Sequence, residues 1–300
     1  MKYGTVKYFL YYSFQSGRLI KKLVRHMKEN ILYPSIANHR ISELLSENIS
    51  NETKAHISRW YAEMMIKEFL KDQLPYIDYE KKSLLELIAD LRGVVDCKII
   101  NSLNLIKDFG DKASHYNSEV NVTVEQALQA VNEAINLYLL IILDELKKRD
   151  LFYHYDRATL ISVLLPTMRV KIYSELIDFS SKEIHLELLW KWSLACLKDG
   201  NINKARRKLQ SLKKNGIISE AILNEYDAKL KIINTAKEND ELPIPVNRED
   251  FARNLQDLLN GGRISPESRQ KNNRLISILL SMAKNIEPSS MKHYKGMLEY

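Results

Sequence analysis

The stretch TVEQALQAVNEAINLYLLII, residues 123–142, decides the fold class of this chain. Thr123 and Gln126 have the spacing of a capping box, in which each side chain satisfies a backbone amide at the start of a helix. Apolar residues then recur three or four positions apart for five turns, which is the period of an amphipathic α-helix. The only segment that could alternate as a strand is 6–14. We therefore predict an all-α protein.

The same period predicts two more long helices before this one. The first is capped by Asn51 and runs to Leu74, where Pro75 follows. The second starts near Glu80, bends or breaks at Gly93 and continues to about Phe109. Four main helices between about 52 and 149 predict an antiparallel bundle.

Changes in pattern along the chain predict four segments. After residue 149, short helices are joined by tight turns that contain Gly or Ser, as in stacked helical hairpins. These hairpins resemble tetratricopeptide repeats without their 34-residue self-similarity. The sequence Leu-Pro-Ile-Pro at 242–245 predicts an extended linker. The predicted segments are a basic amphipathic helical segment at 1–50, the bundle at 51–150, a helical-hairpin domain at 151–240 and a C-terminal helical segment at 246–300.

The hexapeptide GDKASH, residues 110–115, stands between two predicted bundle helices. It resembles the GN-x-A-x-H signature of helical domains related to the HEPN superfamily, with Asp111 in place of the usual Asn. The segment RWYAEM, residues 59–64, is similar to the first core helix of that family. The resemblance covers about a third of the chain. It implies a HEPN-like bundle, a dimer in which two protomers contribute paired motifs, and in many members the cleavage of RNA.

Cleavage in that family needs a base of near-neutral pKa and a cation at the developing oxyanion, without a metal. The resemblance places His115 as the base, but the Arg that usually lies five to seven positions earlier is absent. Lys107 or Lys112 could supply the charge, although Lys lacks the bidentate geometry of a guanidinium. His115 could equally be a structural histidine that fixes the turn, with Asp111 capping or orienting that turn rather than acting as a base. We keep Lys107, Asp111 and His115 as candidate catalytic residues.

Positive charge is concentrated in two segments, although the formal net charge is only +7. Residues 1–30 carry seven Lys and Arg against one Glu, and residues 204–214 carry six with no acid. Such patches are typical of surfaces that bind polyanions, while a solvated helix face is the alternative. The candidate nucleic-acid-binding residues are Arg18, Lys21, Lys22, Arg25, Lys28, Lys112, Arg206, Arg207 and Lys208.

Several classes of protein are not indicated by this sequence. It contains no P-loop, dinucleotide fingerprint or HExxH motif, so we expect no cofactor. Cys97 and Cys196 lie in apolar helical runs without a partner at zinc-ligand spacing, so we expect both to be buried and inert. We predict no signal peptide and no membrane span, and therefore a cytoplasmic protein.

These patterns lead to one functional hypothesis and two alternatives. The first is a homodimeric protein that binds nucleic acid, RNA above all, or a nucleic-acid-processing partner, in a bacterial or phage defence, toxin or restriction system. The second is a metal-independent ribonuclease centred on His115 and Lys107. The third is a scaffold without enzymatic activity, whose helical hairpins hold another protein.

Overall fold

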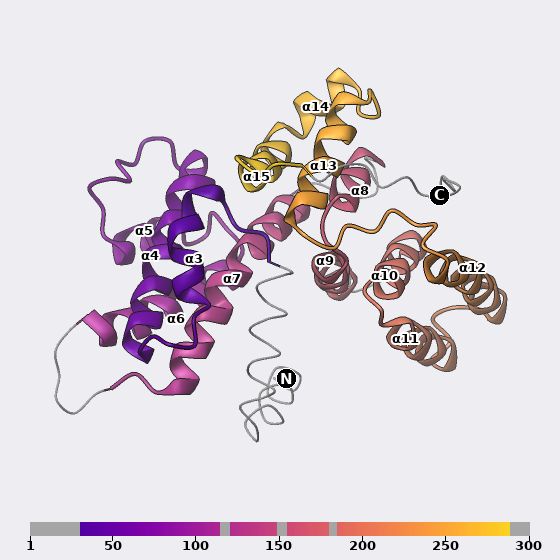
Figure 1. Ribbon diagram of the computed structural model, residues 1–300, viewed down its shortest axis with the longest axis horizontal. Coiled ribbons are helices and arrows are strands. Elements are labelled where there is room, and N and C mark those ends of the chain that lie inside the picture. The colour runs from indigo at the N-terminus through magenta and orange to yellow at the C-terminus, as the bar shows by residue number, and fades with distance from the viewer. Residues whose placement is uncertain (1–30, 115–120, 149–154, 180–184, 289–300) are drawn as a thin grey trace. The chain divides into compact units, whose positions relative to one another are not determined.

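A computed structural model describes residues 31–114, 121–148, 155–179 and 185–288 (Figure 1). Thirteen α-helices and two 3-10 helices make up the regular structure, and no strand occurs within these ranges. The predicted all-α fold is confirmed for the part of the chain that the structure describes. The possible strand at 6–14 lies outside it.

The chain divides into two compact units. Unit 1 consists of Met1–Arg92 and Ile100–Ile135, and unit 2 of Gly93–Ile99 and Asn136–Tyr300. The boundaries fall inside the two long helices α6 (Cys97–Ser114) and α7 (Val124–Lys147), so each of these helices contributes residues to both units.

Unit 1 holds most of α6 and the first half of α7. Its remaining elements are η1 (Ser35–Ala37), α3 (Asn38–Leu44), α4 (Asn51–Phe69), η2 (Lys71–Gln73) and α5 (Leu84–Leu91). Along α7, Ala127, Ala130 and Ala134 are fully buried. Because these side chains are small, neighbouring helices can approach α7 closely, and α6 contributes Leu103 and Ile106 to the same core.

The helix starts of unit 1 follow capping chemistry, with one difference from the prediction. Thr123 and Gln126 form the predicted capping box, since each backbone amide lies 3.3 Å from the other side chain's oxygen. The predicted Asn51 cap of α4 is wrong, because Ser50 is the cap and its Oγ accepts from the Thr53 amide at 3.1 Å. Asn51 lies in the first turn and donates instead to the Val122 carbonyl at 3.3 Å.

Residues 110–114 of the GDKASH hexapeptide do not form the turn that the sequence predicts. Helix α6 continues past Phe109 through Gly110 to Ser114. Phe109 and Ala113 pack against a buried cluster of Ala55, Val122 and Ala127, so one more helical turn buries apolar surface. That burial outweighs the cost of about 1 kcal/mol for a glycine inside a helix. The predicted break at Gly93 is confirmed, because α5 ends at Leu91 and Gly93 has a φ of +78°.

Unit 2 holds the end of α7 and the remaining helices. They are α8 (Tyr155–Ser162), α9 (Pro166–Phe179), α10 (Leu186–Lys198), α11 (Ile202–Lys214), α12 (Glu220–Glu238), α13 (Arg248–Asn260), α14 (Pro266–Lys271) and α15 (Asn273–Ala283). Helices α9 to α12 pack in chain order, and α12 also packs against α10 (Figure 1). Helix α15 packs against α13 and α14.

Glycines make the tight turns between these helical hairpins possible. Gly200 has a φ of +80°, and the amide of Asn201 donates back to the Cys196 carbonyl at 2.8 Å. Gly216 repeats this geometry after α11, with a φ of +71°. A left-handed residue with this hydrogen-bond pattern ends a helix and reverses the chain, and glycine adopts it without steric cost.

Helix α7 is the one described helix that is long and apolar enough to cross a membrane by length and composition. Of its most apolar window, 56% is buried inside the protein. Burial of that extent is typical of the core helix of a bundle.

Candidate functional site

The structure describes only part of the site that the sequence predicts. His115 follows the last described residue of α6, and Arg18, Lys21, Lys22, Arg25 and Lys28 lie before residue 31, so all six are outside the described residues. Lys107, Asp111 and Lys112 lie on the last two turns of α6. Arg206, Arg207 and Lys208 lie on α11.

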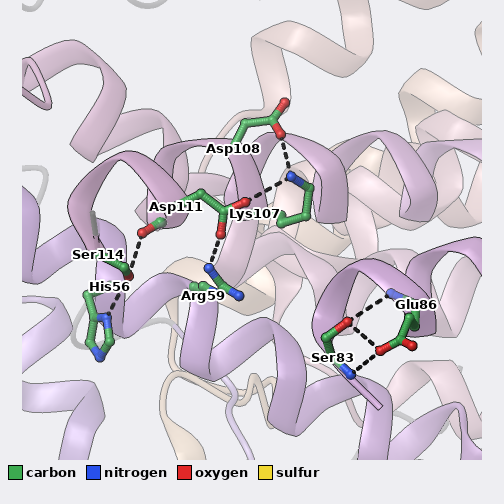
Figure 2. Close-up of polar contacts among 9 residues, drawn as sticks. His56, Arg59, Ser83, Glu86, Lys107, Asp108, Asp111 and Ser114 are labelled. Carbon is green, nitrogen blue, oxygen red and sulfur yellow. Dashed lines mark hydrogen bonds and ion pairs between the residues drawn. The ribbon is translucent and has the colours of Figure 1, made fainter. Parts of the chain in front are cut away.

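Asp111 is the centre of an ion-pair cluster that joins α4 to α6. Its carboxylate accepts from the Arg59 guanidinium and from Lys107, whose Nζ is 3.0 Å from Oδ2 (Figure 2). Lys107 also lies 2.8 Å from Oδ1 of Asp108. The predicted role of Asp111 at a turn is therefore wrong, since Asp111 lies within a helix and holds two cations of different helices.

The charges of this cluster balance, because two cations face two carboxylates. Lys107 has a side chain only 15% exposed and touches both Asp108 and Asp111. A phosphate group could bind Lys107 only by displacing the carboxylate of Asp108 or Asp111. The structure thus places the predicted catalytic Lys107 as a partner of Asp111 rather than as a free cation.

Gly110 explains why α4 and α6 can come this close. A Cβ atom at Gly110 would lie 2.7 Å from Cβ and 2.9 Å from Cδ of Arg59. Separations below about 3 Å are sterically excluded between carbon atoms. The glycine of the hexapeptide therefore acts as a contact point between two helices, and it brings the Arg59 guanidinium to Asp111.

His56 lies one turn before Arg59 on α4 and meets the other end of the hexapeptide. Its Nδ1 is 3.4 Å from Oγ of Ser114, which donates at 2.8 Å to the Gly110 carbonyl (Figure 2). Because that hydroxyl proton is already donated, Ser114 can accept from His56 but is not activated by it as a nucleophile. The His56 side chain is exposed.

Sequence reasoning missed the roles of His56 and Arg59 at this site. Arg59 belongs to a segment that resembles a family core helix, yet it is 52 residues from Asp111 in the chain. The sequence does indicate that His56 and Arg59 lie on one face of α4, because they are three residues apart in a helix. Lys112 stays exposed, with its Nζ 5.6 Å from the centre of the Phe109 ring.

The cations of α11 divide into two sets. Arg206 Nε is 2.9 Å from Oδ1 of Asp227, and Lys213 Nζ is 2.5 Å from a carboxylate oxygen of Glu220, so both side chains are paired with α12 or its start. Four exposed cations have no carboxylate at ion-pair distance among the described residues; they are Lys204, Arg207, Lys208 and Lys214. We call these four residues the α11 stripe, because a rotation of 100° per residue places them on one side of the helix, away from buried Ala205, Leu209 and Leu212.

The tryptophan and cysteine residues and the possible metal ligands do not form a further candidate site. Trp192 is buried, while Trp190 is half-buried and its ring centre lies 5.2 Å from that of Tyr226, with the two rings tilted by 54°. Cys196 is buried, and burial raises its pKa to about 12. Cys97 is exposed, so the prediction that both thiols are buried is wrong for this residue, which occupies the first position of α6. Among the described residues, no three His, Cys, Asp or Glu side chains form a group that could hold a metal ion.

Comparisons with models of protein families, with curated proteins and with solved structures find no match to this chain. The HEPN-like resemblance therefore stays a prediction from the sequence. The function must be argued from the geometry of the described residues.

Proposed function

We propose that the protein binds nucleic acid, with RNA as the preferred class, and that the α11 stripe supplies phosphate contacts. The observation that carries this proposal is the contrast between the two candidate sites. The cations near Asp111 are neutralised by carboxylates, whereas the four cations of the α11 stripe face solvent without one. A role in a defence, toxin or restriction system, a homodimeric state and a cytoplasmic location are part of this proposal and rest on the sequence.

The length of the stripe suits a nucleic-acid backbone. Ten residues separate Lys204 from Lys214, and a rise of 1.5 Å per residue makes this about 15 Å. Each phosphate that a cation neutralises releases counterions, so binding weakens as salt concentration rises. Ser211 lies on the same side of α11 and adds a hydroxyl donor to the stripe.

Replacing all four stripe residues by Gln is expected to weaken binding of single-stranded RNA and to reduce its salt dependence. The slope of log affinity against log salt should fall by up to about 3, at about 0.7 for each lost phosphate contact. Fluorescence anisotropy between 50 and 200 mM salt measures both quantities. The folded state should be unaffected, because the four side chains are exposed.

A matched control removes the same total charge from scattered positions. Lys71, Arg92, Arg263 and Lys284 are exposed and lie on different elements, so their replacement by Gln changes the net charge equally. This control should retain most of the slope. If the stripe variant and the control lost equal affinity for RNA, the effect would be one of general charge and the proposed role of the α11 stripe would be wrong. If the natural chain showed no salt-dependent RNA binding, the scaffold would be the remaining alternative.

A second candidate function, a metal-independent ribonuclease, is favoured by the pairing of Arg59 with Asp111. Arg59 brings a guanidinium to the hexapeptide from another helix, which could replace the Arg that the sequence lacks before His115. His56 adds an imidazole one turn away on the same face of α4. To be held there, a phosphate must displace the Asp111 carboxylate from the Arg59 guanidinium. The imidazole could then move a proton from a ribose hydroxyl.

This candidate makes a different prediction from the binding proposal. RNA cleavage in the presence of EDTA should be abolished by His115→Ala and by Arg59→Ala, while Lys107→Ala should retain it because Lys107 is held by two carboxylates. Gel analysis of a labelled RNA measures the cleavage. Circular dichroism must show that each variant is folded. RNA that stays intact with the natural chain in EDTA excludes the candidate.

A further inference from the structure

Arg169, at the fourth position of α9, is a buried guanidinium without a partner. The residue is 6% exposed, and its Nε and Nη2 atoms are buried with no hydrogen-bond acceptor. No carboxylate lies at ion-pair distance from it among the described residues. The other buried arginines differ, because Arg157 pairs with Glu145 and Arg253 with Asp250. A buried charge that is left unpaired is strongly destabilising.

More positive charge faces Arg169 from α10. Helices α9 and α10 pack against each other as a hairpin, so the start of α9 lies beside the end of α10. Lys198 ends α10, and Lys191 lies two turns earlier on the same face. Burial lowers the pKa of Lys198 to about 8, and repulsion by Arg169 and then Lys191 adds to this shift. Arg169 and Lys191 are thus each close enough to Lys198 to repel its ammonium group.

The surrounding groups do not neutralise this cluster. Asp199 attracts Arg169 but forms no ion pair with it, and its Oδ2 accepts from Nδ2 of Asn201 at 2.8 Å. Lys237 of α12 donates to the Leu197 carbonyl at 2.9 Å, so α12 adds a further cation rather than an acid. Lys191 and Lys198 are only half-buried, which leaves a path from solvent along α10.

We propose that Arg169, Lys191 and Lys198 form a binding site for a phosphate dianion, either free or as a phosphomonoester. A planar guanidinium matches two phosphate oxygens at once, and the ammonium groups add point charges. Arg169, Lys191 and Lys198 with the single carboxylate of Asp199 leave a local charge of +2, to which Lys237 adds, so a dianion matches the site better than a carboxylate does. This site is independent of RNA binding by the α11 stripe.

Thermal unfolding of the full-length protein tests the site with inorganic phosphate against chloride at equal ionic strength. Phosphate should raise the melting temperature saturably, by about 5 °C at one hundred times its Kd. Arg169→Met should melt higher than the natural chain in chloride, because it removes the unpaired charge, and should lose the saturable rise. Lys198→Met should raise the Kd for phosphate at least tenfold, as measured by titration calorimetry. This second variant tests the site even if Arg169→Met does not fold.

Arg253→Met is the matched control, since Arg253 is also a buried arginine but is paired with Asp250. It should melt lower in chloride and keep the phosphate response, which separates specific binding from the general stabilising effect of phosphate salts. A nucleoside 5′-monophosphate and its nucleoside distinguish the source. The site is supported if the monophosphate stabilises the protein and the nucleoside does not, with or without stabilisation by inorganic phosphate. A natural chain without a saturable response to either inorganic phosphate or the monophosphate, or an Arg169→Met variant with an unchanged response, overturns it.

Discussion

Arg157→Met is expected to lower the free energy of unfolding of unit 2 by about 3–5 kcal/mol. Arg157 is fully buried in the first turn of α8. Its Nε donates at 2.8 Å to Oδ1 of Asn272, and its Nη atoms contact the Glu145 carbonyl at 3.3 Å and the Glu145 carboxylate at 3.4 Å. Methionine fills a similar volume but leaves Oδ1 of Asn272 and the Glu145 carbonyl without this donor, and the Glu145 carboxylate keeps only its ion pair with Arg274 among the described residues.

The effect should be confined to unit 2, because Arg157 joins α7, α8 and the residue between α14 and α15 within that unit. Hydrogen exchange measured by mass spectrometry reports on the two units separately, and urea denaturation gives the total loss. Arg207→Met, on the exposed face of α11, is the control and should change stability by less than about 0.5 kcal/mol. A loss below about 1 kcal/mol for Arg157→Met would show that the network is not needed.

The sequence predicts the helical fold well because its signals are local. The capping box at Thr123, the turn at Gly200 and the helix start at Pro166 each depend on residues only a few positions apart. The sequence predicts that α6 ends near Phe109, because a glycine commonly ends a helix, but α6 continues to Ser114. Phe109 packs against Val122 and Ala127, and this contact of α6 with other segments favours the extra helical turn.

The candidate site was less predictable because its contacts join distant segments. Charge counting found the basic residues of α11 but could not tell Arg206, which pairs with Asp227, from Arg207, which does not. In the same way, the pattern around Asp111 offered no reason to choose Arg59 as its partner. Arg169 looks like an ordinary helical arginine in the sequence, and only burial shows that it lacks a counter-charge.

Gly110→Ala is expected to destabilise unit 1 by about 1–3 kcal/mol, although alanine favours a helix. The gain in helix propensity is about 1 kcal/mol, whereas the new methyl group would lie 2.7 Å from Cβ of Arg59. That atom is fixed to the α4 backbone, so the helices must move apart, and overpacking of this kind commonly costs more than the gain. The separation should also loosen the ion pair between Arg59 and Asp111.

A double-mutant cycle with Arg59→Gly identifies the cause, because this change removes the Cβ atom that the new methyl group meets. In the Arg59→Gly background, Gly110→Ala should be neutral or stabilising, so the coupling between the two positions should be at least 1 kcal/mol. Chemical denaturation of the four proteins provides the cycle. Arg59→Ala retains the Cβ atom and should leave most of the penalty in place. Additive effects in the Arg59→Gly cycle would place the cost of the methyl group elsewhere and remove Gly110 as the contact that brings α4 to the hexapeptide.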